Sequence, residues 1–266
     1  MSIPSRPDTL SSWAGQATFC SGGAFTAWVN AWLRGAVSYD SAVSAIHTAG
    51  IRTVRGLPDN PEPAPVGWAL GALRACGGSP LRLVLPVPGD VRGVPAVPGL
   101  PAAAIRAGQL VVGSELALLP EDHRSAGTDW TAWDATTGSA PVPATPGEQL
   151  TVAQAAGALR LAVLEATDVL ASLDVARWSP AVDSLSQRAQ QMSLPPDHDP
   201  NAAALAIRCT QLVPMLELAN TDAPGGAISA RAAAHRDAAL RPLSVAVREA
   251  LMTSFSIVCT GRTVDR

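Results

Sequence analysis

Two charged side chains in the loop at residues 86–93 have the types and spacing to bind a small molecule. The loop follows residues 81–87, whose closely spaced apolar side chains predict a buried strand. Ligands of α/β domains gather at the carboxyl ends of strands, where Asp90 would accept hydrogen bonds and Arg92 would donate a bidentate pair. We therefore predict Asp90 and Arg92 as ligand-binding residues, with the alternative that they pair with each other or cap a turn.

The cysteines and histidines form no pattern that indicates catalysis. Cys20 precedes Ser21-Gly22-Gly23, which predicts the turn that starts a helix, and the helix dipole would lower the pKa of the Cys20 thiol. None of the four histidines has a recognisable spacing to Cys20, so a packed thiol is the ordinary interpretation. We predict no catalytic residue. The sequence leaves open whether the protein is an enzyme and favours one that is not.

Metal and cofactor sites are not indicated either. The four cysteines include no CxxC pair. Asp197-His198-Asp199 are adjacent, so their side chains cannot all point at one ion, and Asp199 stands before Pro200 where a helix cap is expected. The chain has no Lys and matches neither the GxxxxGK[ST] nor the GxGxxG pattern. We predict no metal and no cofactor.

Tryptophan makes up seven of the eleven aromatic residues, which is a strong skew. Trp28 and Trp32 lie four residues apart and share a helical face, whereas Trp130 and Trp133 lie in a segment with few apolar neighbours. Core packing explains most of the skew. Because Trp is enriched at the centres of protein interfaces, we predict these four residues as candidate protein-interaction residues.

Composition narrows the class of protein. Hydrophobic residues make up 47% of the 266 residues and charged residues 15%, which is typical of a globular chain. The net charge of -3 is divided evenly, with nine Arg against ten acidic residues up to position 145 and ten against twelve after it. This balance disfavours nucleic acid as a partner. No apolar run approaches membrane length and no signal pattern opens the chain, so we predict a cytoplasmic protein without membrane contact.

The elements that would hold these residues divide the chain into two parts. Residues 1–144 alternate helices with short strands, which predicts an α/β region with a short mixed sheet. Residues 130–133 would form an edge strand of that sheet. The other expected elements are helices at 24–33, after Ser38, at 66–76 and at 102–107, and strands at 51–55, 81–87, 109–112 and 116–119.

Residues 145–266 instead predict an antiparallel helical bundle. Thr145-Pro146-Gly147-Glu148 matches a capping box with Pro at the first helical position. Ser179-Pro180 and Asp199-Pro200 repeat the arrangement of a cap followed by Pro, and Pro242 is expected to kink or restart the last helix. The predicted fold is therefore α+β and helix-rich, with the α/β region at 1–144 and the bundle at 145–266.

Three segments of the chain are similar to a known group of proteins. They contain AWVNAWL within residues 18–35, LVLPVPGD at residues 83–90 and AALRPL at residues 238–243. These segments resemble an uncharacterised family of actinobacterial proteins of unknown function. The resemblance implies a cytosolic protein from a GC-rich bacterium. It implies no activity, so no site residue is carried over from it.

These observations favour a non-catalytic adaptor or regulatory protein that acts through protein-protein contacts. We predict a homodimer that forms through a face of the bundle, and a protein partner that the sequence does not identify. The prediction depends on plentiful helical stripes and Trp pairs beside a lack of nucleotide, metal and nucleophile motifs. The alternative is a small-molecule-binding protein or enzyme with a pocket between the α/β region and the bundle, lined by the loop of Asp90 and Arg92.

Overall fold

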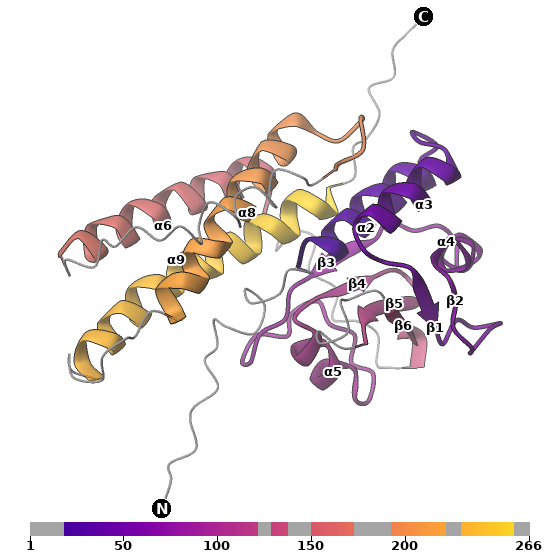
Figure 1. Cartoon of the computed structure of the whole chain (residues 1–266), viewed down its shortest axis with the longest axis horizontal. Helices are drawn as coiled ribbons and strands as arrows, with labels where there is room; N and C mark the ends of the chain where they lie inside the picture. Colours follow the sequence, from indigo (N-terminus) through magenta and orange to yellow (C-terminus); the bar gives the residue numbers. More distant parts are fainter. Residues whose placement is uncertain (1–18, 122–128, 138–149, 173–192, 222–229, 258–266) are drawn as a thin grey trace, which may run out of the picture.

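The computed structural model of the chain describes residues 19–121, 129–137, 150–172, 193–221 and 230–257. Within these ranges the fold is mixed α+β, with seven α-helices and one six-stranded mixed sheet. Figure 1 shows the sheet and its helices on one side and three long helices on the other. We call the first part the α/β region (residues 19–137) and the second the helical region (residues 150–257). None of the helices in the described ranges is long and apolar enough to cross a membrane.

The sheet is antiparallel except for one pair of strands. Its order is β2-β1-β6-β5-β4-β3, and β1 pairs with β6 in parallel. The other neighbouring strands pair antiparallel. The strands are β1 (Thr53–Arg55), β2 (Ala64–Pro65), β3 (Arg82–Val84), β4 (Leu110–Val112), β5 (Leu116–Pro120) and β6 (Asp129–Asp134), and β6 leads into a 3-10 turn, η1 (Ala135–Thr137).

Helices cover both faces of this sheet. Val111 of β4 packs in the cluster formed with α2, α3 and α4, whereas its neighbours Leu110 and Val112 pack against α5 on the opposite face. Strands that are buried on both faces carry continuous apolar runs, which is why β4 and β5 were visible in the sequence. The helices are α2 (Phe19–Leu33), α3 (Tyr39–Thr48), α4 (Val66–Ala75) and α5 (Leu100–Ala107).

The strand at residues 130–133 is internal, so the prediction of an edge strand is wrong. It forms β6, between β1 and β5. Trp130 is 1% exposed, and its ring stacks on Phe25 with 5.9 Å between the ring centroids. In the described ranges, two helices and four strands separate β6 from its parallel partner β1 along the chain, and such distant pairing leaves no local signal. The predicted helix at 66–76 and the strands at 109–112 and 116–119 are confirmed.

Ser21-Gly22-Gly23 is helical, so the prediction of a turn before a helix is also wrong. Helix α2 already begins at Phe19. The two glycines are needed for close packing, because a Cβ on Gly23 would lie 2.7 Å from the ring of Phe255. A Cβ on Gly22 would lie 2.6 Å from the Gln109 side-chain oxygen, which accepts a hydrogen bond from the Gly22 amide. Cys20 lies in the first turn of α2 rather than in a loop.

Three helices form the described part of the helical region. They are α6 (Val152–Ser172), α8 (Pro200–Thr221) and α9 (Ala230–Ser256). Helix α9 packs against both of the others and runs back toward the α/β region, whereas α6 and α8 run away from it (Figure 1). Pro242 lies inside α9 on its exposed side, and the helix continues through it instead of restarting. A kink at this position stays a prediction.

Two of the predicted helix starts can be compared with the structure. Asp199 caps α8 as expected, with its side chain accepting a hydrogen bond of 2.8 Å from the Ala202 amide. The start predicted at Thr145 is wrong, because α6 begins at Val152 after a reciprocal capping box in which Thr151 and Gln154 bond each other's amides. The start at Ser179-Pro180 lies outside the described residues.

One apolar cluster joins the two regions. Ala27 of α2, with Leu83 and Leu85 of β3 and its following loop, packs among buried residues of α6, α8 and α9. Phe255, fully buried near the end of α9, belongs to the same cluster. The end of α9 is therefore part of the core of the α/β region. The boundary at 144 and 145 remains a prediction.

Candidate functional site

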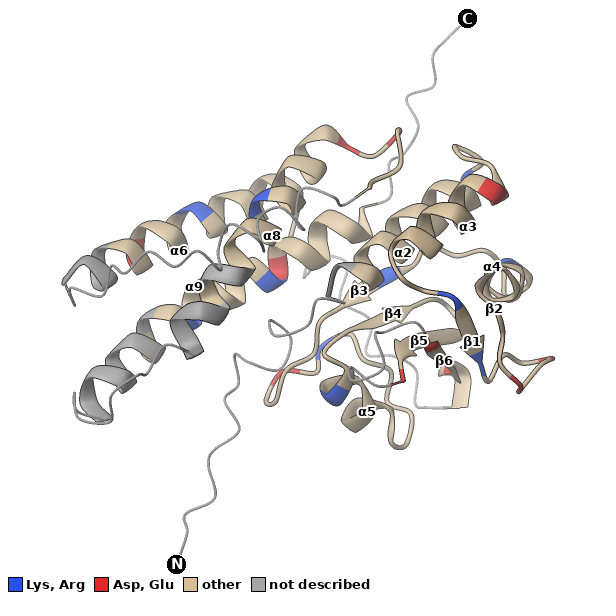
Figure 2. Cartoon of the chain, in the orientation of Figure 1, with Lys and Arg blue, Asp and Glu red and all other residues tan. Residues whose placement is uncertain are grey.

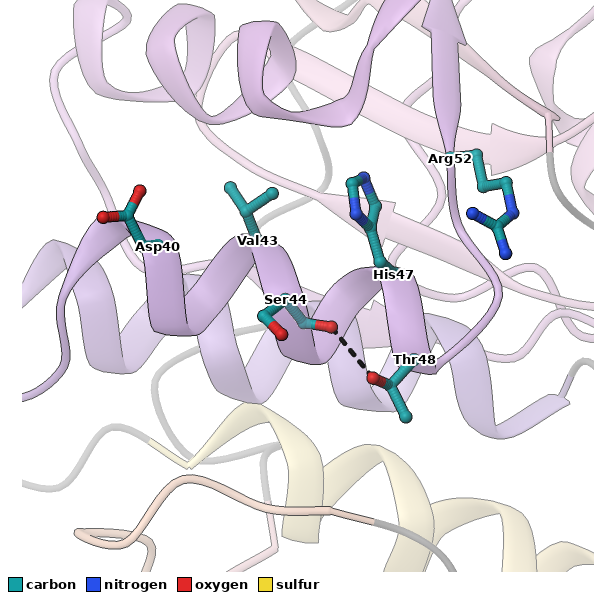
Figure 3. Close-up of a pocket in the computed structure, with 6 residues that line it drawn as sticks. All are labelled: Asp40, Val43, Ser44, His47, Thr48 and Arg52. Carbon is teal, nitrogen blue, oxygen red and sulfur yellow. Dashed lines mark hydrogen bonds between the residues drawn. The ribbon is translucent and has the colours of Figure 1, made fainter.

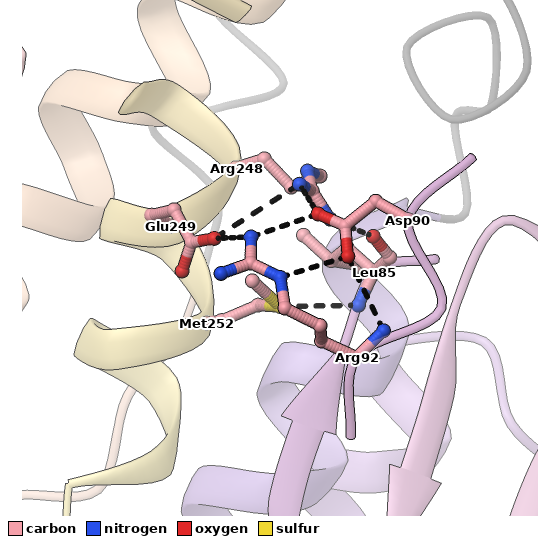
Figure 4. Close-up of polar contacts among 6 residues, drawn as sticks. All are labelled: Leu85, Asp90, Arg92, Arg248, Glu249 and Met252. Carbon is pink, nitrogen blue, oxygen red and sulfur yellow. Dashed lines mark hydrogen bonds and ion pairs between the residues drawn. The ribbon is translucent and has the colours of Figure 1, made fainter. Parts of the chain in front are cut away.

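The loop of Asp90 and Arg92 lies against α9. Figure 4 shows the two side chains facing each other and the helix. Arg92 donates Nε to one Asp90 oxygen at 2.9 Å and Nη2 to the other at 2.8 Å. Its Nη2 also bonds Glu249 at 2.7 Å, and Asp90 additionally accepts a hydrogen bond from Arg248. Arg248, Asp90, Arg92 and Glu249 therefore form a chain of alternating charge, which we call the joint network.

The electrostatics of the joint network follow from these bonds. The hydrogen bonds from Arg92 hold the pKa of Asp90 well below its usual range, helped by Arg248 and opposed by partial burial. The Arg248 side chain is only 6% exposed, so its charge is stabilised by other residues of the chain and not by water. Asp90 and Arg92 pair with each other, as the alternative interpretation expected. Their role in binding a ligand stays a prediction.

Helix α9 also completes the hydrogen bonding of β3 at the edge of the sheet. Arg248, Met252 and Ser256 follow one another at four-residue steps and so share one face of α9. Arg248 Nη1 donates to the Leu85 carbonyl at 3.0 Å, and the Leu85 amide donates to the Met252 sulfur at 3.3 Å. The Leu83 amide donates to the Ser256 hydroxyl at 2.9 Å. One helix face thus takes the place of a neighbouring strand.

Helix α2 covers the remaining part of the same edge. The Asn30 side chain accepts from the Leu81 amide at 2.7 Å and donates to the Leu81 carbonyl at 3.0 Å. Asn30 is 2% exposed, so both of these bonds are shielded from water. The backbone of β3 and its flanks is consequently held from outside by side chains of α2 and α9.

Two residues of the segment Asp197-His198-Asp199 have separate structural roles. Asp197 forms an ion pair of 2.5 Å with Arg34 at the end of α2, and Asp199 caps α8. Burial lowers the pKa of His198. In the ranges that the structure describes, no group of three or more His, Cys, Asp or Glu could hold a metal ion.

Three of the four Trp predicted to contact a partner are buried within the chain. Trp130, Trp28 and Trp32 are 1%, 9% and 8% exposed. The Trp28 indole donates to the Ser193 carbonyl at 2.9 Å, which ties α2 to the segment before α8. Trp133 is partly buried and packs in the cluster of α5. A partner-binding role for these four residues stays a prediction, and their observed contacts are internal.

Trp68 differs from these four residues and was missed by the sequence reasoning. It lies on α4 and is 58% exposed. Its neighbours on the helix, Ala69 and Leu70, are fully buried. Trp68 precedes a run of apolar residues, so nothing in the sequence separates it from the core residues beside it.

A shallow groove of about 450 Å³ lies along α3. Figure 3 shows Asp40, Val43 and His47 pointing into it from α3, with Arg52 at one end. The Thr48 hydroxyl donates a hydrogen bond of 3.0 Å to the Ser44 carbonyl. Among the described residues, no ion pair involves Asp40, His47 or Arg52. The groove carries both signs of charge beside the apolar Val43, so it selects no single class of ligand.

The outer face of α6 exposes large apolar side chains. Leu161 and Leu164 are 58% and 59% exposed. The opposite face of the helix packs into the cluster that contains α9, through Ala155, Leu159, Ala162 and Ala166. We define the outer α6 face as Gly157, Leu161 and Leu164, flanked by the exposed residues Arg160 and Glu165. The sequence carried a signal for this face, because the apolar stripe predicted for the helix runs through Leu159, Val163 and Ala166 and leaves out both leucines.

Charge is thinly spread over both regions. Figure 2 shows acidic and basic residues interspersed along the described parts of the chain.

Comparison with known proteins identifies relatives along almost the whole chain. The family model described as the N-terminal domain of Rv1486c-like protein matches residues 22–149, and the C-terminal domain model matches residues 153–252. "Uncharacterized protein Rv1486c" of Mycobacterium tuberculosis strain ATCC 25618 / H37Rv is 28% identical, over 90% of this chain and 97% of the relative. "Uncharacterized protein MT1533" of strain CDC 1551 / Oshkosh matches to the same extent. No solved structure matches this chain.

Proposed function

This chain belongs to the Rv1486c-like protein family of actinobacteria, and from that premise we propose that it is a non-catalytic protein that acts through contacts with other proteins. We further propose that α6, α8 and α9 form an antiparallel bundle whose outer surface makes those contacts. The free thiols Cys76 and Cys209 suit a reducing compartment, so we propose the cytoplasm as its location.

The observation that carries this proposal is the outer α6 face. Leu161 and Leu164 lie one turn apart, and each leaves more than half of its side-chain surface in water. Exposed apolar residues that occur singly need no explanation, but neighbouring leucines on one helix mark a contact surface. Covering them removes apolar surface from water, which is the main favourable term in protein association.

The small-molecule alternative has less support. It requires a pocket between the α/β region and the helical region beside Asp90 and Arg92. In that place Arg248 and Glu249 already satisfy both side chains. A ligand would have to displace these bonds to bind there.

Cross-linking in cells tests the proposed function. The double variant Leu161→Glu/Leu164→Glu places charge on the outer α6 face, and Val245→Glu, at a 44% exposed position of α9, is the matched control. A photo-reactive residue at Ala158 should form adducts with protein in the parent and in the Val245→Glu chain. We expect those adducts to disappear in the double variant. If the parent forms no protein adduct at this position, the proposed function is wrong.

A further inference from the structure

We infer that the outer α6 face binds the same face of a second copy of this chain, with the two α6 helices parallel. This inference rests on the proposed function, since it names the partner of the face proposed there. It depends on how the leucines and the flanking charges are arranged around the helix. Leu161, Leu164 and Gly157 supply the contact, and Arg160 and Glu165 supply the orientation.

Helix geometry places the two charges symmetrically about the apolar residues. At about 100° per residue, Gly157, Leu161 and Leu164 fall within an arc of about 60°. Arg160 lies about 70° to one side of the centre of that arc, and Glu165 lies about 70° to the other side. The outer α6 face therefore has a positive flank and a negative flank, and both flanking residues are exposed.

Two-fold symmetry then decides which flanks meet. In a parallel pair the axis runs along the helices, so the positive flank of one copy faces the negative flank of the other. In an antiparallel pair like flanks meet, and Arg160 would face Arg160. The five-residue step from Arg160 to Glu165 is the step between the charged g and e′ positions of parallel coiled coils. Charge complementarity therefore favours the parallel pair.

The apolar residues fit the same arrangement. Leu161 and Leu164 take the a and d positions of one heptad, and Gly157 takes the preceding d position. Nothing lies within 4 Å of a Cβ added at Gly157, so the helix surface is open there. A residue without a side chain at d lets two helix backbones approach closely at the N-terminal end of the contact.

The expected dimer is weak, because the contact is short. One heptad of helix buries less than the ~1,200 Å² that marks the lower limit of stable interfaces. We therefore expect a dissociation constant on the order of micromolar rather than nanomolar. A self-association of this strength responds to the local concentration of the chain.

Sedimentation of the full chain across a concentration series tests the pairing. We expect dimers in the parent, a shift to monomers in Leu161→Glu, and at least a tenfold weaker association in Arg160→Glu. The exchanged variant Arg160→Glu/Glu165→Arg restores the complementary flanks, so it should recover association to within a few-fold of the parent. Arg208→Glu, an exposed position of α8, is the matched charge control.

Disulfide cross-linking tests the orientation separately. Gly157→Cys and Leu164→Cys place a thiol at two sites about 10.5 Å apart along the helix. In a parallel pair each introduced cysteine lies opposite the same cysteine of the second copy, so both variants should form covalent dimers. In an antiparallel pair at most one position near the axis can do so. The oxidised parent gives the background from the natural cysteines, and circular dichroism checks that each variant is folded.

The outcomes separate the inference from the proposed function. A parent that stays monomeric up to about 1 mM overturns the inference. If such a monomer still gives Leu161-dependent adducts with another protein in cells, the proposed function stands and its partner is a different chain. If it gives neither dimers nor adducts, both are wrong. Covalent dimers from only one of the two cysteine variants overturn the parallel orientation alone.

Discussion

The joint network and the outer α6 face differ in what their side chains contact. At the joint, four charged residues are satisfied by one another and by the β3 backbone. On α6, two leucines of core type are left in water. Charge at the joint therefore holds the chain together, whereas the apolar surface on α6 is left for the contacts proposed above. If that proposal holds, burial separates structural from functional residues in this protein better than residue chemistry does.

The largest expected effect on stability is the difference between substituting two leucines that lie two residues apart on α6. Leu159 is 1% exposed and Leu161 is 58% exposed. We expect Leu159→Ala to lower the free energy of unfolding by about 3 kcal/mol, because it leaves a cavity against α9. Leu161→Ala should change it by less than ~0.5 kcal/mol. Urea unfolding at about 0.1 µM protein, where a micromolar dimer is largely dissociated, measures both. Equal losses of unfolding free energy in the two variants would show that Leu161 is packed within the chain as Leu159 is.

Arg248 should carry most of the stability of the joint network. Arg248→Met leaves both the Leu85 carbonyl and the Asp90 carboxylate without this donor. Because that carbonyl is buried, we expect a loss of about 2 kcal/mol in the free energy of unfolding. The matched control is Arg241→Met, at an exposed position of the same helix. A loss no larger than in the control would mean that the network does not hold α9 in place.

Acid should weaken the joint through Asp90. Its pKa is lowered in the folded chain, so the unfolded chain binds a proton first as the pH falls. The stabilisation is complete above the unfolded pKa of about 4, and it declines as the pH drops below that value toward the folded pKa. Urea unfolding at several pH values between neutrality and pH 3 should show a shallower pH dependence in Asp90→Asn. An unchanged slope would exclude Asp90 as a source of acid sensitivity.

Arg92 should have the smallest effect, although it forms more bonds to Asp90 than Arg248 does. Its side chain is 73% exposed, so water can replace the lost bonds. We expect Arg92→Met to cost less than ~1 kcal/mol in thermal unfolding. The bonds from Arg248 to Asp90 and Leu85 remain in that variant. A loss larger than in Arg248→Met would reverse our ranking of the two arginines.

Local signals predicted much of the fold. Helix α4 and the start of α8 at Asp199 follow from patterns within a few residues of each other. Strands β4 and β5 were found because burial on both faces makes their residues uniformly apolar. The position of β6 inside the sheet was not predictable, since its parallel partner β1 is distant in the chain.

The site could be predicted less well than the fold. Asp90 and Arg92 were predicted to bind a ligand, and the structure shows the alternative pairing between them. A further partner of Asp90, Arg248, is 158 positions away in the chain. No local pattern reveals such a contact. The outer α6 face depends on which of two apolar sides of one helix meets α9. The helical period does separate the two leucines, because Leu159 lies on the apolar stripe predicted for this helix and Leu161 does not.

The cover that α9 provides for β3 affects how the protein is made. Ser256 and the Leu83 amide that it bonds are 173 positions apart. At bacterial rates of synthesis, roughly 10 to 35 s pass between the emergence of these two residues from the ribosome. During that interval the strand has the cover from α2 but lacks the part that α9 supplies, so the edge at Leu83 and Leu85 is exposed. We therefore expect a chain truncated before α9 to aggregate. Folding of the α/β region is completed only when translation is nearly finished.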